Sequence, residues 1–348
     1  MTTEVLEDIL RLQLKPLVRK IDREAYYPRD FLISIGKSGF FLSEGLSDQE
    51  IRLRYTGMIE QTAKVCMTTA FNLWCHLAAL TFISKSSNTF IKKEILPLLE
   101  NGETLGATGL SNSMKYYAGL EKLHLKAKRT DGGYIISGHL PAVSNLGKGH
   151  WFGVIAEAEK GQRIMSLLPS NAEGLILKEK RDYLGVNGSA TYVCEFQNVY
   201  IPDKWMISEQ ADAFVSSIRP AFVLYQIPLG LGVTAASIES IQKVSNKQGG
   251  SNQYLRIQPD ELLSEMQIIR EKLYRMAESS DINQHWREIV ELRLKVVELT
   301  AKSTHAAMLH QGGAGYLQHS DPSRRLREAY FLLNLTPTVK QLEKMLCS

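Results

Sequence analysis

Three glycines near the C-terminal end are the residues whose type and spacing first point to a binding role. Gly312, Gly313 and Gly315 lie in the stretch HQGGAGYLQHS, which begins at His310. Inside a helix each glycine costs about 1 kcal/mol relative to alanine. An ordinary turn between helices explains one glycine but explains three less well. The flanking His310 and His319 could titrate near neutral pH, although a single histidine more often has a structural role.

The other chemically reactive side chains limit the kind of site that this chain can carry. Its four cysteines are scattered, with no CxxC and no Cys/His cluster, which indicates neither a disulfide framework nor a zinc site. The net charge of +4 comes from 41 basic and 37 acidic side chains without a long run of either sign. This pattern gives no footprint for nucleic acid or an anionic membrane. We therefore expect no metal, no nucleic acid and no membrane among its partners, and reduced thiols in the cytoplasm.

Apolar stretches need to be distinguished from membrane spans and signal peptides. The most apolar one, from Thr62 to Ile83, contains Lys64, Asn72 and His76. These polar groups favour a buried helix of a soluble protein over a membrane span. The first residues, MTTEVLEDILRLQLKPL, mix charges with apolar residues at helical spacing, which excludes the uninterrupted apolar core of a signal peptide.

The hydrophobic period changes twice along the chain, which predicts an α+β fold in three parts. Residues 1–103 and 208–348 have helical spacing, with stripes such as Leu262, Met266 and Ile269 that must pack against a core. Residues 104–207 contain short alternating or apolar runs, and the DGG triplet after Thr130 marks a tight turn between two of them. We predict an N-terminal helical domain, a middle β-sandwich or barrel, and a C-terminal helical bundle.

Two segments of the chain have more specific predictions. The apolar runs 190–196 and 199–201 read as two short strands. The polar, glycine-rich segment SNKQGGSNQ, residues 245–253, predicts a loop between two helices.

This order of helices, β domain and helices resembles the acyl-CoA dehydrogenase family of flavoproteins over nearly the whole chain. Five separated motifs carry the resemblance in the right order: REAYYPRDFLISIGKSGFF, FIKKEILPLLENGETLGATGLS, GGYIISGHLPAVSNL, LGVNGSATYVCEFQNVYIP and GGAGYLQHSDPSRRLREA. The resemblance implies FAD as cofactor, an acyl-CoA or related small molecule as substrate, and a homodimer or homotetramer. It also implies that the glycine stretch meets the FAD of a neighbouring subunit, where residues without Cβ let backbone N–H groups approach a pyrophosphate.

The resemblance assigns individual residues to the cofactor and the substrate. Thr108 falls where the family contacts the pyrimidine end of the flavin, and Ser144 falls where a Thr hydroxyl faces the flavin N5. A serine hydroxyl can make the same hydrogen bond as threonine. The full set of implied cofactor residues is Thr108, Ser144, Lys247, Gly312, Gly313, Gly315 and Thr338. The implied substrate residues are Ser113 and Arg219.

Several positions depart from the family pattern and weaken these implications. Ala142 replaces the Trp beside the flavin, Gly109 replaces a Glu, and Leu309 replaces a Gln near the adenosine. The R..FG loop of the family is missing. Lys247 nevertheless lies where the spacing along the chain places the phosphate-binding Arg of that loop. A lysine supplies the charge without the bidentate fork, and a solvated loop lysine accounts for Lys247 equally well.

The catalytic base is missing from both places where the family has one. The family's Glu aligns with Thr336 in TPT, and the alternative position in SIRP is Ile218, before Arg219. Glu328 aligns with a structural acid of the family, so we expect it to be an ion-pair partner. The catalytic residue is therefore unknown from the sequence.

Three functions stay open on the sequence alone. The first is an FAD-dependent oxidoreductase of the acyl-CoA dehydrogenase type that acts on CH–CH groups of an acyl thioester with an unidentified base. The second is a flavin monooxygenase of the same fold, which needs no base for an α-proton. The third is a non-catalytic relative that has lost flavin, which is favoured by the joint loss of the Trp, the Gln, the Arg loop and the base.

Overall fold

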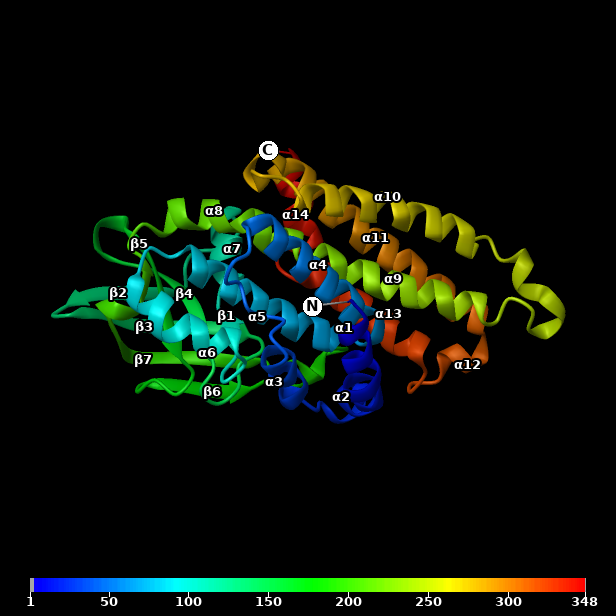
Figure 1. Cartoon of the computed structure of the whole chain (residues 1–348), viewed down its shortest axis with the longest axis horizontal. Helices are drawn as coiled ribbons and strands as arrows, with labels where there is room; N and C mark the ends of the chain where they lie inside the picture. The colour runs from blue at the N-terminus through cyan, green and yellow to red at the C-terminus, as the bar shows by residue number, and fades with distance from the viewer. Residues whose placement is uncertain (1–2, 348) are drawn as a thin grey trace.

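The computed structural model describes residues 3–347 and has helices at both ends of the chain with its strands between them (Figure 1). The helices before the sheet are α1 (Thr3–Ile9), α2 (Val18–Glu24), α3 (Arg29–Lys37), α4 (Asp48–Val65), α5 (Met67–Lys85) and α6 (Leu96–Glu100). The strands and the helix among them are β1 (Gly106–Thr108), α7 (Ser111–Tyr117), β2 (Leu125–Thr130), β3 (Gly133–Val143), β4 (Trp151–Glu157), β5 (Arg163–Pro169), β6 (Leu175–Glu179), β7 (Tyr192–Pro202) and β8 (Met206–Ser208). The helices that follow are α8 (Ala211–Leu224), α9 (Ile227–Gln242), α10 (Pro259–Ala277), α11 (Trp286–Gln311), α12 (Gly313–Tyr316), α13 (Asp321–Asn334) and α14 (Val339–Cys347). This arrangement confirms the predicted α+β fold class, while the exact domain boundaries stay a prediction.

The helices from the two ends of the chain share one hydrophobic core. Helix α4 packs along α9, and α9 packs along α11. Helix α5 is buried on nearly every side, because its surface is apolar all round and each face meets another element. The apolar stretch from Thr62 to Ile83 thus lies inside the protein, as predicted, but extended backbone at Cys66 divides it between α4 and α5. Among the described residues, one segment, Ala211–Gln242, is long and apolar enough to span a membrane, and 94% of its most apolar window is buried in the fold.

The middle of the chain forms an eight-stranded sheet in the order β6-β7-β3-β2-β4-β5-β8, with β1 parallel to β4. The predicted turn after Thr130 joins β2 to β3, with Gly132 at a φ of 69°. A single pair, Lys126 with Glu157, connects β2 to β4, so two half-sheets enclose their own apolar core. The two predicted runs at 190–196 and 199–201 are one strand, β7, with Asn198 at a φ of 57° between them.

Strand β1 carries the first predicted site residue to the edge of the sheet that faces the helices. Its register places Thr108 opposite Gly153 of β4, and Thr108 also forms an isolated bridge with Ser144, just after β3. The next residue, Gly109, donates its N–H to the Gly153 carbonyl at 2.9 Å. A Cβ at position 109 would lie 2.6 Å from that carbonyl oxygen, so the close approach of the two backbones requires glycine there.

Candidate functional site

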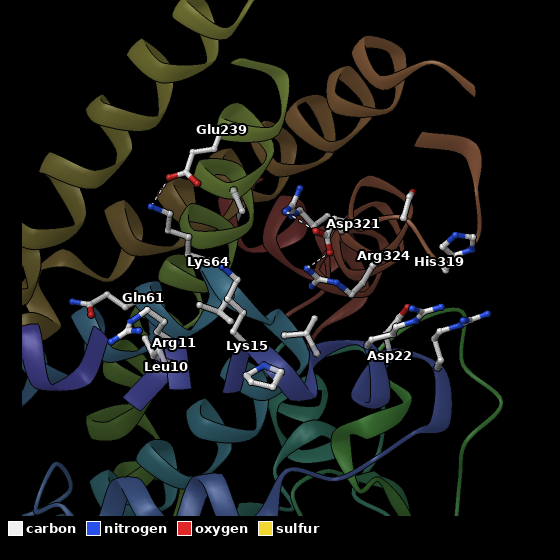
Figure 2. A pocket seen from close by; sticks show the side chains of 18 of the residues that line it. Leu10, Arg11, Lys15, Asp22, Gln61, Lys64, Glu239, His319, Asp321 and Arg324 are labelled. Atoms are coloured by element: carbon white, nitrogen blue, oxygen red, sulfur yellow. Dashed lines mark hydrogen bonds and ion pairs between the residues drawn. The ribbon is translucent and has the colours of Figure 1, made fainter. Parts of the chain in front are cut away.

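Two of the cavities that border the described helices are candidate sites, and only one of these two contains predicted site residues. A cavity of about 930 Å³ is lined by charged side chains from α1, α2, α4, α9 and α13 (Figure 2). None of the residues assigned to cofactor or substrate lines it. A second cavity of about 150 Å³ contains Thr108, Ser144 and Thr336, and we call it the hydroxyl pocket. Its lining residues are Phe71, Trp74, Thr108, Ser111, Ala142, Ser144, Tyr183, Val186, Ser189, Thr191, Phe222, Phe331, Asn334, Leu335 and Thr336.

Hydroxyl groups from three separate segments meet on the sheet side of this pocket. The Ser144 Oγ lies 2.7 Å from the Thr191 Oγ1, which lies 2.8 Å from the Ser189 Oγ. The backbone bridge between Thr108 and Ser144 places Thr108 next to this group, and Thr108 lines the same pocket. These groups can donate and accept hydrogen bonds without carrying charge. The sequence reasoning missed Ser189 and Thr191, although both lie in the LGVNGSATY motif.

Buried polar contacts hold the loop that carries Ser189 and Thr191. Val186 and Ala190 have left-handed backbone, with φ values of 57° and 48°. The Ser189 carbonyl accepts the Asn145 N–H at 2.8 Å, and the Asn72 side chain of α5 donates to the Gly188 carbonyl at 3.2 Å. Left-handed backbone at residues other than glycine is unfavourable, so the surrounding contacts must fix this conformation.

Two buried histidines support the same edge of the sheet from behind. The His76 Nδ1 accepts the Gly106 N–H of β1 at 2.8 Å. The His150 ring lies 2.9 Å from the Asn145 carbonyl, next to Ser144. Burial lowers the pKa of His76 to about 3, with a further contribution from His150, and burial lowers the pKa of His150 to about 4. Both rings are therefore neutral structural partners at physiological pH, and neither lines the pocket.

Aromatic rings form the helix side of the pocket. Phe71 stacks on Trp74 with ring centroids 5.6 Å apart, and Phe331 meets Phe71 edge to face at 4.8 Å. Phe222 of α8 meets Trp74 in the same way at 4.8 Å. The remaining volume is below the ~300–1,000 Å³ that is usual for small-molecule sites. A planar ring system can enter only when these aromatic side chains shift.

The position of the expected base contributes a hydroxyl to the pocket. The Thr336 Oγ1 lies 3.0 Å from the Ser111 Oγ, and the Gln226 side chain donates to the Thr336 carbonyl at 2.9 Å. The fully buried Arg293 donates to the Gln226 side chain, also at 2.9 Å, and so fixes its orientation. No carboxylate, imidazole, amine or thiol lines the pocket among residues 3–347, and burial raises the pKa of its Tyr183. The structure thus provides no side chain in the pocket that can remove an α-proton.

The glycine stretch at α12 lies in the helical part of the molecule away from the sheet (Figure 1), and none of its three glycines lines the hydroxyl pocket. Gly312 ends α11 with a φ of 57°, and Gly313 begins the short helix α12, so the predicted loop is largely a helical turn. A Cβ added at Gly312 or Gly313 would meet no other atom of the described residues within 4 Å, whereas one at Gly315 would lie 2.8 Å from the Gln311 Cβ. Packing inside one chain therefore does not explain the first two glycines.

Lys247 lies at the same end of the helical bundle as the glycines. Its side chain is exposed in a short connection after α9, and a 3₁₀ segment, Gln248–Tyr254, follows where the sequence predicted a loop. The Asn252 side chain joins this segment to α11 by donating to the Val244 and His310 carbonyls at 2.8 and 3.1 Å. The structure thus groups Lys247 with the glycines and separates both from Thr108 and Ser144.

Three other predicted residues make local contacts outside the hydroxyl pocket. The Thr338 Oγ1 accepts the Gln341 N–H at 3.4 Å at the start of α14. The Ser113 hydroxyl donates to the Leu110 carbonyl at 2.9 Å. The Arg219 guanidinium lies 4.6 Å from the Trp286 ring centre. Their roles toward cofactor or substrate stay predictions.

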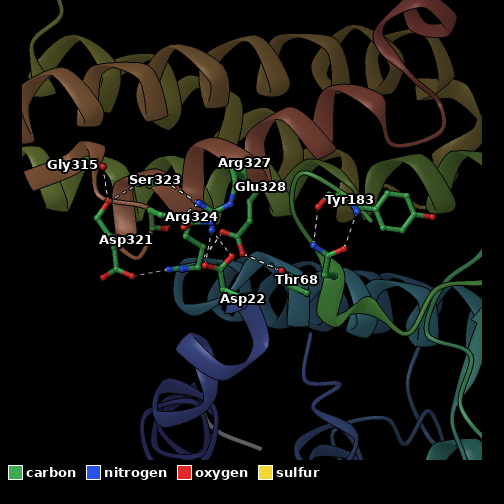
Figure 3. A network of polar contacts seen from close by, with 12 residues as sticks. Asp22, Thr68, Tyr183, Gly315, Asp321, Ser323, Arg324, Arg327 and Glu328 are labelled. Atoms are coloured by element: carbon green, nitrogen blue, oxygen red, sulfur yellow. Dashed lines mark hydrogen bonds and ion pairs between the residues drawn. The ribbon is translucent and has the colours of Figure 1, made fainter. Parts of the chain in front are cut away.

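A buried ion-pair network, defined by Arg324, Glu328, Arg327 and Asp22, fixes α13 against α2 and α5 (Figure 3). The Arg324 Nη1 lies 2.8 Å from the Glu328 Oε2, and the Glu328 side chain is 2% exposed. Glu328 also accepts the N–H and hydroxyl of Thr68 at the start of α5. Glu328 is an ion-pair partner, as the sequence suggested, and it does not line the hydroxyl pocket.

Comparisons with known proteins agree on the fold and find acyl-CoA dehydrogenases as similar sequences. No family model matches the chain. A probable acyl-CoA dehydrogenase of Mycobacterium tuberculosis is 23% identical over 341 residues, covering 91% of this chain and 86% of that protein. The mitochondrial isovaleryl-CoA dehydrogenase of Solanum tuberosum is 22% identical, covering 91% and 81%.

Solved structures match the whole chain at low sequence identity. A glutaryl-coenzyme A dehydrogenase complex has a TM-score of 0.89 at 18% identity, covering 100% of this chain and 95% of that one. The prolyl acyl carrier protein oxidase AnaB gives 0.83 at 16%, covering 99% and 97%. The dibenzothiophene monooxygenase TdsC of Paenibacillus sp. A11-2 gives 0.81 at 15%, covering 99% and 95%. One fold thus accommodates dehydrogenases, an oxidase and a monooxygenase.

Proposed function

We propose that the chain, which is similar to acyl-CoA dehydrogenases over nearly its whole length, is an FAD-dependent oxidoreductase that acts on an acyl thioester or related substrate at the hydroxyl pocket. The observation that carries the proposal is the convergence of the Ser144, Thr191 and Ser189 hydroxyls beside Thr108 at one edge of the sheet, where sequence motifs had assigned Thr108 and Ser144 to the flavin. We propose a cytoplasmic homodimer or homotetramer as its working form.

The donors in the pocket fit a flavin. Thr108, Ser144 and Thr191 offer neutral hydroxyls that can meet both donors and acceptors of a flavin edge. Gly312 and Gly313 present open backbone, and Lys247 presents a cation, to a cofactor held mainly by another copy of the chain. Bound FAD supplies the acceptor for a hydride equivalent from the substrate.

The chain's own residues then bind and orient the substrate and exclude water. The rings of Phe71, Trp74 and Phe331 provide the apolar wall, and Thr336 offers a hydroxyl held by Ser111. A hydroxyl at this position cannot serve as the general base that the family uses for an α-proton. Oxidation of an ordinary acyl-CoA by this chain is therefore expected to be slow.

A flavin monooxygenase is the second candidate, because the pocket has no base and such a reaction does not need one at the α-carbon. The similarity in fold to TdsC is compatible with this function. The small free volume and the mutually bonded hydroxyls favour the third candidate, a relative that has lost flavin.

An absorption spectrum of the purified protein, followed by reconstitution with FAD, separates these functions. Bound FAD that acyl-CoA bleaches without oxygen supports the proposed oxidoreductase. Bound FAD that acyl-CoA leaves unchanged, but whose reoxidation by oxygen is coupled to substrate hydroxylation, supports the monooxygenase. A folded protein that remains colourless with excess FAD would contradict both. A Thr191→Val variant, which removes one hydroxyl at constant shape, is the matched test that the hydroxyl pocket holds the cofactor.

A further inference from the structure

The cavity of about 930 Å³, which we call the charged cavity, has the size of a small-molecule site (Figure 2). It lies between the first helices of the chain and the ends of α4 and α9, beside the start of α13. Its lining shares no residue with the hydroxyl pocket. The charged cavity is therefore a separate site from the hydroxyl pocket.

Cations outnumber acids around the charged cavity. The cations are Arg11, Lys15, Arg19, Arg23, Lys64, Lys243, Arg324 and Arg325, and the acids are Glu7, Asp22, Glu239 and Asp321. Most of the acids already have partners: Glu239 pairs with Lys64 at 2.5 Å, Asp321 with Arg324 at 3.3 Å, and Asp22 with Arg327 at 2.6 Å. No acid lies within 4 Å of Lys15, Arg19, Arg23 or Lys243 in the described part of the chain.

Three residues that line this cavity have buried polar atoms without a hydrogen-bond partner in the described part of the chain. The Arg325 side chain is 12% exposed, its Nε and Nη1 have no partner, and its nearest carboxylate oxygen, on Asp321, is 3.8 Å away. The Arg324 Nε and the Gln61 Oε1 are also buried without partners. An unsatisfied buried group costs about 1–3 kcal/mol, and more when it is charged. The arginine N–H groups suit a ligand with several acceptor atoms, and the Gln61 Oε1, which only accepts hydrogen bonds, suits a donor group of the same ligand.

The start of α13 adds to the attraction for an anion. Ser320 caps this 14-residue helix by accepting the Ser323 N–H at 3.1 Å, and both Ser320 and Asp321 line the cavity. The N-terminal end of a helix carries a partial positive charge that favours anions. The apolar side chains of Leu10, Val18 and Val65 border the same space and can cover an uncharged part of a ligand.

We propose that the charged cavity binds a phosphorylated small molecule of the nucleoside diphosphate class. A diphosphate fits better than a single carboxylate, because the Arg325 guanidinium on α13 and the separate cations on the first helices can each contact different oxygens. The nucleoside lies against the apolar border. The site lies near the start of α13 and is separate from the hydroxyl pocket.

Titration calorimetry on the full chain, with FAD present in excess, tests this proposal with ADP, inorganic pyrophosphate and adenosine as probes. We expect one ADP per chain, weaker binding of pyrophosphate, and no detectable binding of adenosine, with affinities that fall as salt is raised. The Arg325→Met variant keeps the length of the side chain and removes the guanidinium. We expect it to lower ADP affinity by roughly tenfold or more, since hydrogen bonds to charged groups contribute about 1.5–3 kcal/mol.

Three further variants make the result decisive. Lys15→Met tests the opposite wall of the cavity and should also lower the affinity for ADP. It replaces Arg325→Met as the test if that variant does not fold. Arg275→Met removes an exposed arginine on α10 that pairs with Glu288 away from the cavity, and it should leave affinity unchanged. Failure of ADP and pyrophosphate to bind the wild-type chain would overturn the proposal. ADP binding of unchanged affinity in both cavity variants would also overturn the proposal. If ADP binding were lost only in Gly312→Val, the anion would instead be assigned to the glycine stretch.

Discussion

The hydroxyl pocket and the charged cavity differ in whether their buried polar groups have hydrogen-bond partners. In the pocket, Ser144, Thr191 and Ser189 bond to one another, and aromatic rings occupy most of the space. At the cavity, Arg325 and Gln61 keep buried atoms without partners beside a large open volume. A neutral, self-satisfied site can stay closed until a ligand displaces the rings. A positively charged site whose buried donors lack partners can bind an anion without first displacing other side chains.

The largest expected effect concerns the ion pair between the two sites. Glu328→Ala should destabilise the fold by about 3–5 kcal/mol, because it leaves Arg324 buried without its main partner. Urea unfolding followed by circular dichroism measures this change. The matched control is Asp321→Ala, which removes an acid that is 66% exposed from the same arginine and should cost less than about 1 kcal/mol. Equal losses in both variants would show that burial of the pair is unimportant.

Introducing a base should convert the neutral pocket into a dehydrogenase site. We expect Thr336→Glu to raise the rate of anaerobic flavin bleaching by an acyl-CoA by about 10²–10⁴-fold, the usual contribution of a positioned general base. Stopped-flow absorption of the flavin measures the rate, and Thr336→Gln is the control of similar size without basicity. If the Glu variant binds FAD and folds but gains nothing over Gln, the pocket is not a site of acyl-CoA oxidation.

Acid should weaken the hydroxyl pocket through the histidines that support it. His76 and His150 stay neutral in the folded chain, with pKa values of about 3 and about 4, whereas in the unfolded chain each takes up a proton below about pH 6.5. The unfolded state thus binds more protons as pH falls, so stability is steady above about pH 6.5 and declines from there toward pH 3. Urea midpoints measured across this range should show a shallower decline in His76→Gln. An unchanged slope in that variant would contradict the role of His76.

The smallest effect distinguishes the hydroxyl chain from simple packing. Thr191→Val removes the central hydroxyl at nearly constant shape and should reduce FAD affinity by roughly tenfold, at about 1.4 kcal/mol per decade, with a stability change of about 1 kcal/mol. Equilibrium dialysis with FAD measures the affinity. Thr130→Val, at the exposed end of β2, is the control and should change neither quantity.

Much of the fold could be predicted from the sequence because its signals are local. The helical stripe at Leu262 and Met266 and the turn after Thr130 appear where period and turn chemistry place them. The joining of two runs into β7 could not be read from the chain, because a residue with left-handed backbone at Asn198 is stabilised by its neighbours in the sheet. Of the candidate site, Thr108 and Ser144 were predicted from motifs. Ser189 and Thr191 were missed, because only the folded conformation of their loop brings these two hydroxyls to Ser144.

The sequence by itself determined the order of helical and β parts, the family resemblance and the loss of a carboxylate at Thr336, since each depends on residue type and spacing along the chain. Only the tertiary structure decided that the hydroxyls bond to one another, that rings from α5, α8 and α13 close the pocket, and that the Arg325 Nε and Nη1 are buried without hydrogen-bond partners among the described residues. The physical reason is that hydrogen bonding, burial and charge balance depend on contacts between residues that are far apart in the sequence. Local sequence patterns do not specify those contacts.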